Sequence, residues 1–149
     1  MSGGNSVGRW LGMLHRYARK RFGEQMTLHG LADAQFPVLM SLLHEDGVSQ
    51  DELAQHHMLD KATVARSVAR LEELGYVTRQ RDGQDRRVKR VLVTELARAI
   101  KPDLRRIREE WSETLTEGFS DEERETLERL LERMADNAGR FIEREMKAE

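Results

Sequence analysis

Basic side chains gather between Arg79 and Arg90, in a stretch suited to binding a polyanion. The stretch holds six Lys or Arg residues and two acids, and Asp-Gly-Gln-Asp at 82–85 indicates a turn between two strands. An arginine at the tip of such a hairpin can enter a DNA minor groove, whose negative potential attracts guanidinium groups. We expect Asp85 to pair with a neighbouring arginine and to fix the shape of the hairpin. The residues alone leave open which arginine enters, and the candidates at this tip are Asp85, Arg86 and Arg87.

The segment 60–75 before the hairpin has the pattern of an amphipathic helix. Asp60 suits the N-cap and Gly75 the left-handed position after the helix. The stripe expected to be buried consists of Val64, Val68 and Leu71, with Leu74 at its end. On the opposite face, small alanines let the backbone approach base edges, and arginines supply contacts to guanine or phosphate. Because the N-terminal residues of such a helix enter the major groove, the base-edge candidates are Lys61, Ala62, Thr63 and Arg66.

A shorter helix precedes this one after a tight connection. Ser49 and Glu52 have the spacing of a capping box at its start, and a few residues around 57–59 separate the two helices. Two short helices joined so closely, the second longer and basic, indicate a helix-turn-helix. Contacts to the DNA backbone are expected from Ser49, Gln50, Arg70 and Arg79.

The rest of the chain is expected to be helical, apart from strands at 76–79 and 88–93. Helices are predicted at 7–25, 33–44, 95–118 and 120–146, and residues 1–8 are expected to form a flexible leader. The terminal helices have more apolar surface than one small core needs, which favours a dimer interface over packing within one chain. The predicted fold is mainly α with a small β-hairpin wing. Its winged helix-turn-helix lobe spans 32–94, and long N- and C-terminal dimerisation helices lie in a helical region formed by 1–31 and 95–149.

The net charge of −2 conceals an uneven distribution along the chain. Residues 60–101 carry eleven basic and six acidic side chains, whereas residues 32–59 carry five acids and no Lys or Arg. Phosphate contact requires a local basic patch rather than an overall positive charge. The charge pattern is therefore compatible with nucleic-acid binding.

Several functional classes lack the residues they need. The chain has no cysteine, which excludes disulfides, thiolate metal sites and cysteine-based redox sensing. No apolar run approaches the ~18–20 residues that cross a bilayer, and the N-terminus lacks a signal-peptide core, so we expect a cytoplasmic protein without membrane contact. The sequence has no phosphate loop and no Gly-x-Ser-x-Gly motif, so no enzymatic activity is expected. The five histidines lack the spacing of metal ligands, and no metal or other cofactor is expected.

The run from Ser49 to Thr94 resembles the MarR family of winged-helix transcriptional regulators, and the order of elements agrees over the whole chain. The wing pattern of the family, Asp-x-Arg-x-x-x-Val-x-Leu-Thr, is matched by Asp85, Arg87, Val91 and Thr94, with Val93 in place of the Leu. This resemblance implies that Arg87 enters the minor groove and that Asp85 positions it. The sequence departs from the family at Ala97, where Gly is usual, and at the turn His56-His57-Met58, which more often contains Gly. Both departures are expected to affect local backbone geometry.

The resemblance also implies a small effector. Members of the family commonly respond to anionic aromatics or phenols held between the dimer helices and the DNA-binding lobe. Arg16 is suited to meet a carboxylate while aromatic and Met side chains surround a ring, although ordinary packing explains any one of these residues as well. The candidate pocket residues are Trp10, Met13, Leu14, Arg16, Tyr17, Phe36, Met40 and Trp111.

These observations predict a homodimer that binds double-stranded DNA in a sequence-specific manner at a pseudo-palindromic operator. Such regulators are most often repressors, and the expected effector is a small phenol or aromatic carboxylate that releases the DNA. The alternatives are a helical protein-interaction module and a non-specific architectural DNA binder. Salt-dependent binding to a duplex would separate the interaction module from the regulator.

Overall fold

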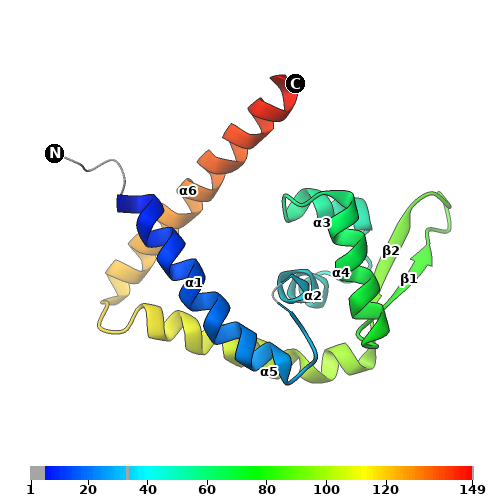
Figure 1. Ribbon diagram of the computed structural model, residues 1–149, viewed down its shortest axis with the longest axis horizontal. Helices are drawn as coiled ribbons and strands as arrows, with labels where there is room; N and C mark the ends of the chain where they lie inside the picture. The colour runs from blue at the N-terminus through cyan, green and yellow to red at the C-terminus, as the bar shows by residue number, and fades with distance from the viewer. Residues whose placement is uncertain (1–5, 33, 149) are drawn as a thin grey trace. The chain divides into compact units, whose positions relative to one another are not determined.

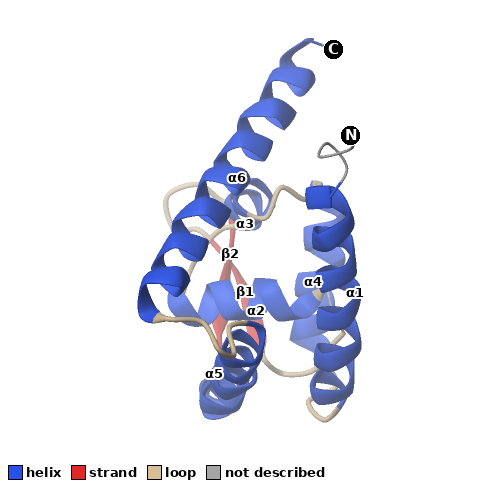
Figure 2. Cartoon of the chain, turned by 90° about the vertical axis from the view of Figure 1, so that its left-hand side faces the viewer, coloured by secondary structure: helices blue, strands red, loops and turns tan. Residues whose placement is uncertain are grey.

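The computed structural model describes residues 6–32 and 34–148 (Figure 1). The elements are α1 (Ser6–Thr27), α2 (Gln35–His44), α3 (Gln50–His56), α4 (Lys61–Glu73), β1 (Val77–Arg81), β2 (Lys89–Val93), α5 (Glu95–Leu115) and α6 (Asp121–Ala148). The chain forms two compact units, residues 1–109 and 110–149. The mainly helical fold with a hairpin wing is confirmed (Figure 2). The predicted division into dimerisation region and DNA-binding lobe follows function rather than compactness and stays a prediction.

The core of the first unit lies where α2, α3 and α4 meet the hairpin. The predicted stripe of α4, Val64, Val68 and Leu71, is fully buried, and Leu74 at its end is half-buried against the same core. The other elements of this unit each add fully buried side chains, which are Met26, Leu39, Leu42, Leu53, Val77, Val91 and Leu104. Burial of one face of α4 leaves its opposite face to solvent. No helix within the described ranges has the length and hydropathy needed to cross a membrane.

The hairpin is anchored on one side by the turn between α2 and α3. β1 and β2 pair antiparallel, with Val77 opposite Val93 and Arg79 opposite Val91. On the other edge of β2, the Gly47 N–H donates to the Val91 carbonyl at 3.1 Å, and the Val91 N–H donates to the Val48 carbonyl at 2.9 Å. The base of the wing is thereby held beside the start of α3.

The predicted helix caps are confirmed. The Ser49 hydroxyl accepts the Glu52 N–H at 3.1 Å, and the Glu52 carboxylate accepts the Ser49 N–H at 2.8 Å. Asp60 accepts the Thr63 N–H at 2.8 Å at the start of α4, and Gly75 after it has a φ of 81°. Ser120 and Glu123, which have the same spacing, form a capping box at the start of α6 as well. These local signals therefore fix the starts of α3 and α6 and both ends of α4.

Several predicted boundaries are wrong. α1 begins at Ser6, so residues 6–8 are helical rather than part of a leader, and residues 1–5 lie outside the described residues. α2 begins at Gln35, and the predicted start, Asp33, also lies outside them. β1 extends to Arg81 because its last two residues pair with β2. α5 ends at Leu115, and residues 116–118 form a turn.

Met58 lies in the turn between α3 and α4 and has a φ of 52°, in the left-handed region. Glycine is more usual in this turn in the family that the sequence resembles. A side chain in this conformation costs roughly 1–2 kcal/mol, whereas the added freedom of glycine in the unfolded chain costs roughly 0.5–1 kcal/mol. The Met58 side chain is 52% exposed, so little packing would be lost. Ala97, the other departure, is buried in the first turn of α5 and lies in ordinary helix.

We therefore expect Met58→Gly to raise the free energy of unfolding by up to about 1 kcal/mol in chemical denaturation. Met58→Ala is the matched control, because alanine keeps the Cβ that causes the strain and should not stabilise. Equal stabilisation by both variants would contradict the strain at this turn.

Candidate nucleic-acid interface

The exposed face of α4 carries a short chain of polar contacts at its N-terminal end. The Thr63 hydroxyl donates to Asp60 Oδ2 at 2.6 Å and accepts from an Arg66 Nη2 at 3.1 Å. The Asp60 carboxylate accepts hydrogen bonds from both the hydroxyl and the backbone N–H of Thr63, and these bonds lower the pKa of Asp60. Lys61 lies 3.4 Å from Asp51 of α3, and Ala62 is exposed beside it. The predicted base-edge residues thus lie together at the start of the helix, with the guanidinium of Arg66 held toward that end.

The four predicted backbone contacts have partners within the lobe or lie partly buried. Ser49 is only 6% exposed, and its hydroxyl caps α3. Gln50 is half-buried, with a side-chain oxygen that has no hydrogen-bond partner within the described residues. Arg70 pairs with Glu73 at 3.0 Å, and Arg79 pairs with Glu72 at 2.9 Å. Their contacts to DNA stay predictions.

The wing tip presents Arg87 in a fixed orientation. Its Nε donates to Asp85 Oδ1 at 3.1 Å and its Nη2 to Asp85 Oδ2 at 3.2 Å, a two-pronged pairing. The Arg87 N–H also donates to Asp85 Oδ1, at 3.1 Å. These bonds from Arg87 lower the pKa of Asp85, so the carboxylate stays charged. The predicted pairing of Asp85 with a neighbouring arginine is confirmed, while the Arg87 side chain remains 91% exposed.

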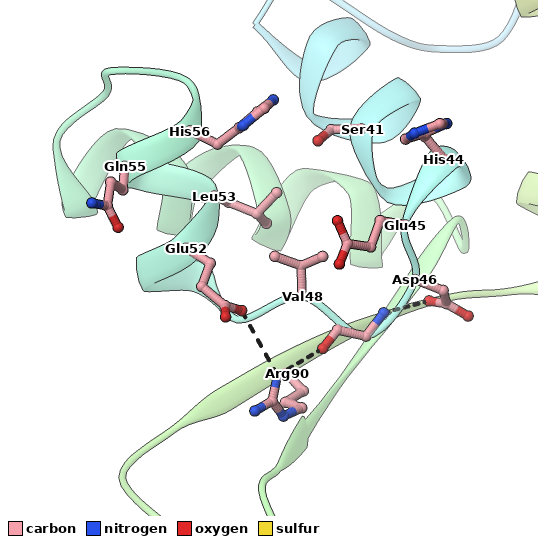
Figure 3. Close-up of a pocket in the computed structure, with 11 residues that line it drawn as sticks. Ser41, His44, Glu45, Asp46, Val48, Glu52, Leu53, Gln55, His56 and Arg90 are labelled. Carbon is pink, nitrogen blue, oxygen red and sulfur yellow. Dashed lines mark hydrogen bonds and ion pairs between the residues drawn. The ribbon is translucent and has the colours of Figure 1, made fainter.

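Sequence reasoning missed the residues that attach the wing to the helices. Arg90 of β2 donates to Asp82 at 2.6 Å and to the Gly47 carbonyl at 3.0 Å. It also lies 3.7 Å from Glu52 (Figure 3). The Arg90 guanidinium is the largest cause of the lowering of the Asp82 pKa from 3.8 to about 2. Glu72, which holds Arg79, also has a lowered pKa because of that arginine. Each strand of the wing therefore has one arginine paired with a glutamate of the helix-turn-helix: Arg79 with Glu72, and Arg90 with Glu52.

A polar cavity of about 520 Å³ lies above Arg90, between α2 and α3 (Figure 3). Its walls include His44 and Glu45 of α2, and Glu52 and His56 of α3. Within the described residues, no group of three His, Asp or Glu side chains is placed to hold a metal ion. The base of the wing still belongs to the apolar core, because Val77, Val91 and Val93 are buried in it.

The predicted effector-pocket residues are spread over both units. On α1, the side chains of Trp10, Leu14 and Tyr17 are each more than two-fifths exposed, and Arg9 lies over the Trp10 ring at 5.6 Å. Met13 and Arg16 belong to the same helix, and Trp111 lies in the second unit.

Phe36 and Met40, the two predicted pocket residues of α2, pack against the core of the first unit. Phe36 stacks on Phe22 with ring centroids 5.4 Å apart, and both rings line a cavity of about 160 Å³. Its other walls come from His15, Ala18, Arg19 and Met26.

Comparison with known proteins assigns this architecture to a family. The model of the MarR family matches residues 29–88. The uncharacterized HTH-type transcriptional regulator YybA of Bacillus subtilis is 30% identical over 136 residues, which are 91% of each chain.

Solved structures agree. A MarR transcriptional regulator from Methanosarcina mazei is 38% identical with a TM-score of 0.86, over 91% of this chain and 97% of its own. A mutant MarR from E. coli in complex with operator DNA is 25% identical with a TM-score of 0.76, over 90% of this chain and 99% of its own. YybA and the Methanosarcina mazei protein are named transcriptional regulators, a class of protein that is not enzymatic.

Proposed function

Because this chain belongs to the MarR family of DNA-binding transcriptional regulators, we propose that it acts as a homodimeric repressor on a pseudo-palindromic operator. Each protomer places α4 in a major groove and its wing in the flanking minor groove, with half-sites about one helical turn, ~10 bp, apart. Its place of action is the cytoplasm. Binding blocks transcription until an effector lowers the affinity for DNA.

One observation carries the DNA-binding part of this proposal. The Arg87 side chain is 91% exposed at the wing tip, yet its guanidinium donates hydrogen bonds to both carboxylate oxygens of Asp85. An arginine held in one orientation loses little rotamer freedom on entering a narrow groove. The same lobe presents Arg66 on the exposed face of α4. Arg66 is thus available for the major groove and Arg87 for the minor groove.

Exposed apolar side chains on the terminal helices support the homodimer. α6 has no buried residue within one chain. Its apolar side chains are therefore exposed: Leu130, Leu131 and Ile142 are each 44% exposed, and Phe141 is 61% exposed. α1 likewise exposes Trp10 and Tyr17. Monomeric proteins seldom leave such apolar stripes in water, and a second copy of the chain would cover them.

The effector is proposed to be a small phenol or aromatic carboxylate bound among the predicted residues of α1 and α2. The stacked rings of Phe22 and Phe36 supply an aromatic wall, and Arg16 and Arg19 of α1 supply cationic partners for a carboxylate. The cavity of about 160 Å³ at these rings has room for a single-ring ligand and little more.

Base preference tests the proposed reading by α4. Arg66→Ala is expected to weaken binding to the operator by ~1–3 kcal/mol and to relax the preference at one base position, because a bidentate contact would be lost. Fluorescence anisotropy with operator and scrambled duplexes measures both effects. Arg108→Ala, at an exposed position on α5, is the matched control and should leave the preference unchanged. Equal losses on both duplexes would make Arg66 a phosphate contact and favour a non-specific architectural binder.

A further inference from the structure

Arg90 joins three segments of the DNA-binding lobe through one guanidinium group. Its Nε donates to Asp82 Oδ2 in the wing loop at 2.6 Å. Its Nη1 donates to the Gly47 carbonyl in the turn before α3 at 3.0 Å and lies 3.7 Å from Glu52 Oε2 of α3. Figure 3 shows the Arg90 guanidinium facing Glu52, and a dashed line marks this ion pair. Glu52 is itself fixed, because its carboxylate accepts the Ser49 N–H at 2.8 Å.

Asp82 continues this connection to the wing tip. While Oδ2 holds Arg90, Oδ1 accepts the Gln84 N–H at 2.7 Å and the Asp85 N–H at 3.3 Å. Asp85 in turn holds the guanidinium of Arg87 through both of its oxygens. A continuous series of polar contacts therefore leads from the start of α3 to the residue proposed to enter the minor groove.

Two arginines attach the wing to the helices: Arg79 of β1 pairs with Glu72 of α4, and Arg90 of β2 makes the attachment from the outer part of the wing, residues 80–90. Among residues 80–90, all of which the structure describes, Arg90 is the one residue whose side chain forms hydrogen bonds or ion pairs with α3 or with the turn before it. Arg90 also lines the cavity of about 520 Å³ between α2 and α3. A two-stranded hairpin is marginally stable by itself, so its direction depends on such attachments.

We propose that Arg90 is a positioning residue that sets the direction of the wing and so brings Arg87 to the minor groove. This proposal rests on the proposed DNA contact of Arg87. It assigns no DNA contact to Arg90 itself. Loss of the Arg90 attachment would leave Arg87 exposed and paired with Asp85, but the wing would no longer direct it toward the minor groove.

A double-mutant cycle on a duplex that carries the operator tests the proposal. Arg90→Gln is expected to weaken binding about as much as Arg87→Ala does, at least about tenfold, and Arg87→Ala in that background should change the affinity less than about twofold. Arg90→Lys should not restore the coupling, because an ammonium lacks the planar fork that reaches several acceptors. Asp82→Asn, which removes the other half of the attachment, should show the same loss of coupling and serves if Arg90→Gln folds poorly.

Lys89→Gln is the matched control, since Lys89 is an exposed basic residue of the same strand for which the structure shows no such contacts. Its effect and that of Arg87→Ala should add. Additive effects of Arg90→Gln and Arg87→Ala, with rescue by Arg90→Lys, would overturn the proposal and make Arg90 a direct phosphate contact. A silent Arg87→Ala in the otherwise unchanged protein would instead refute the proposed role of Arg87, and the positioning role would fall with it.

Discussion

Phe141→Asp is expected to convert the protein to a monomer and to lower its affinity for a two-half-site operator at least about a hundredfold. The loss is large because a dimer binds its second half-site at high effective concentration, which contributes about 10²–10⁴ in affinity. Phe141 is 61% exposed within one chain, so the substitution removes little packing there. A buried carboxylate facing an apolar partner surface is strongly unfavourable. Light scattering after size exclusion measures the mass, and anisotropy measures the affinity.

Glu132→Asp is the control for this prediction, because it introduces the same side chain at an exposed position of α6 outside the apolar stripe. It should remain dimeric and bind normally. If the unaltered protein already runs as a monomer, or if Phe141→Asp leaves the mass unchanged, α6 does not form the proposed interface.

Arg87→Ala is expected to weaken operator binding by about tenfold to a hundredfold and to flatten the salt dependence by about one unit of log–log slope. Two causes act together. The guanidinium leaves the groove, and Asp85 loses the partner that neutralises it beside the DNA phosphates. Titrations at several salt concentrations give both the affinity and the slope.

Arg86→Ala is the matched control, since Arg86 is the neighbouring arginine and its side chain makes no hydrogen bond within the described residues. Its effect should be the smaller of the two. A larger loss with Arg86→Ala would assign the minor-groove contact to that residue and leave the Asp85–Arg87 pair a purely internal feature.

Elements with local end signals could be predicted from the sequence. The capping boxes at Ser49 and Ser120, and the pair of Asp60 and Gly75 around α4, act through neighbouring residues and need no knowledge of the fold. The first helix was predicted from residue 7, one residue from its start at Ser6, although residues 1–8 were also expected to form a leader. The end of β1 was missed because pairing with β2, rather than its own polar residues, determines it.

The site divides in the same way. The pairing of Asp85 with an arginine follows from a spacing of two residues along the chain, and it was predicted. The contact of Arg90 with the Gly47 carbonyl joins residues 43 positions apart, and periodicity carries no signal for it. Charge counting also could not reveal that Arg79 and Arg90 are paired with glutamates of the helices. A basic hairpin therefore shows where DNA binding is expected but not which arginines are free to bind.

Selection of bound duplexes from a random DNA pool, at near-physiological salt, tests the central claim most directly. A homodimer with one α4 and one wing per half-site should enrich an inverted repeat whose halves lie ~10 bp apart. Retention of DNA without an enriched repeat, or no retention at all, would contradict sequence-specific recognition by a symmetric dimer.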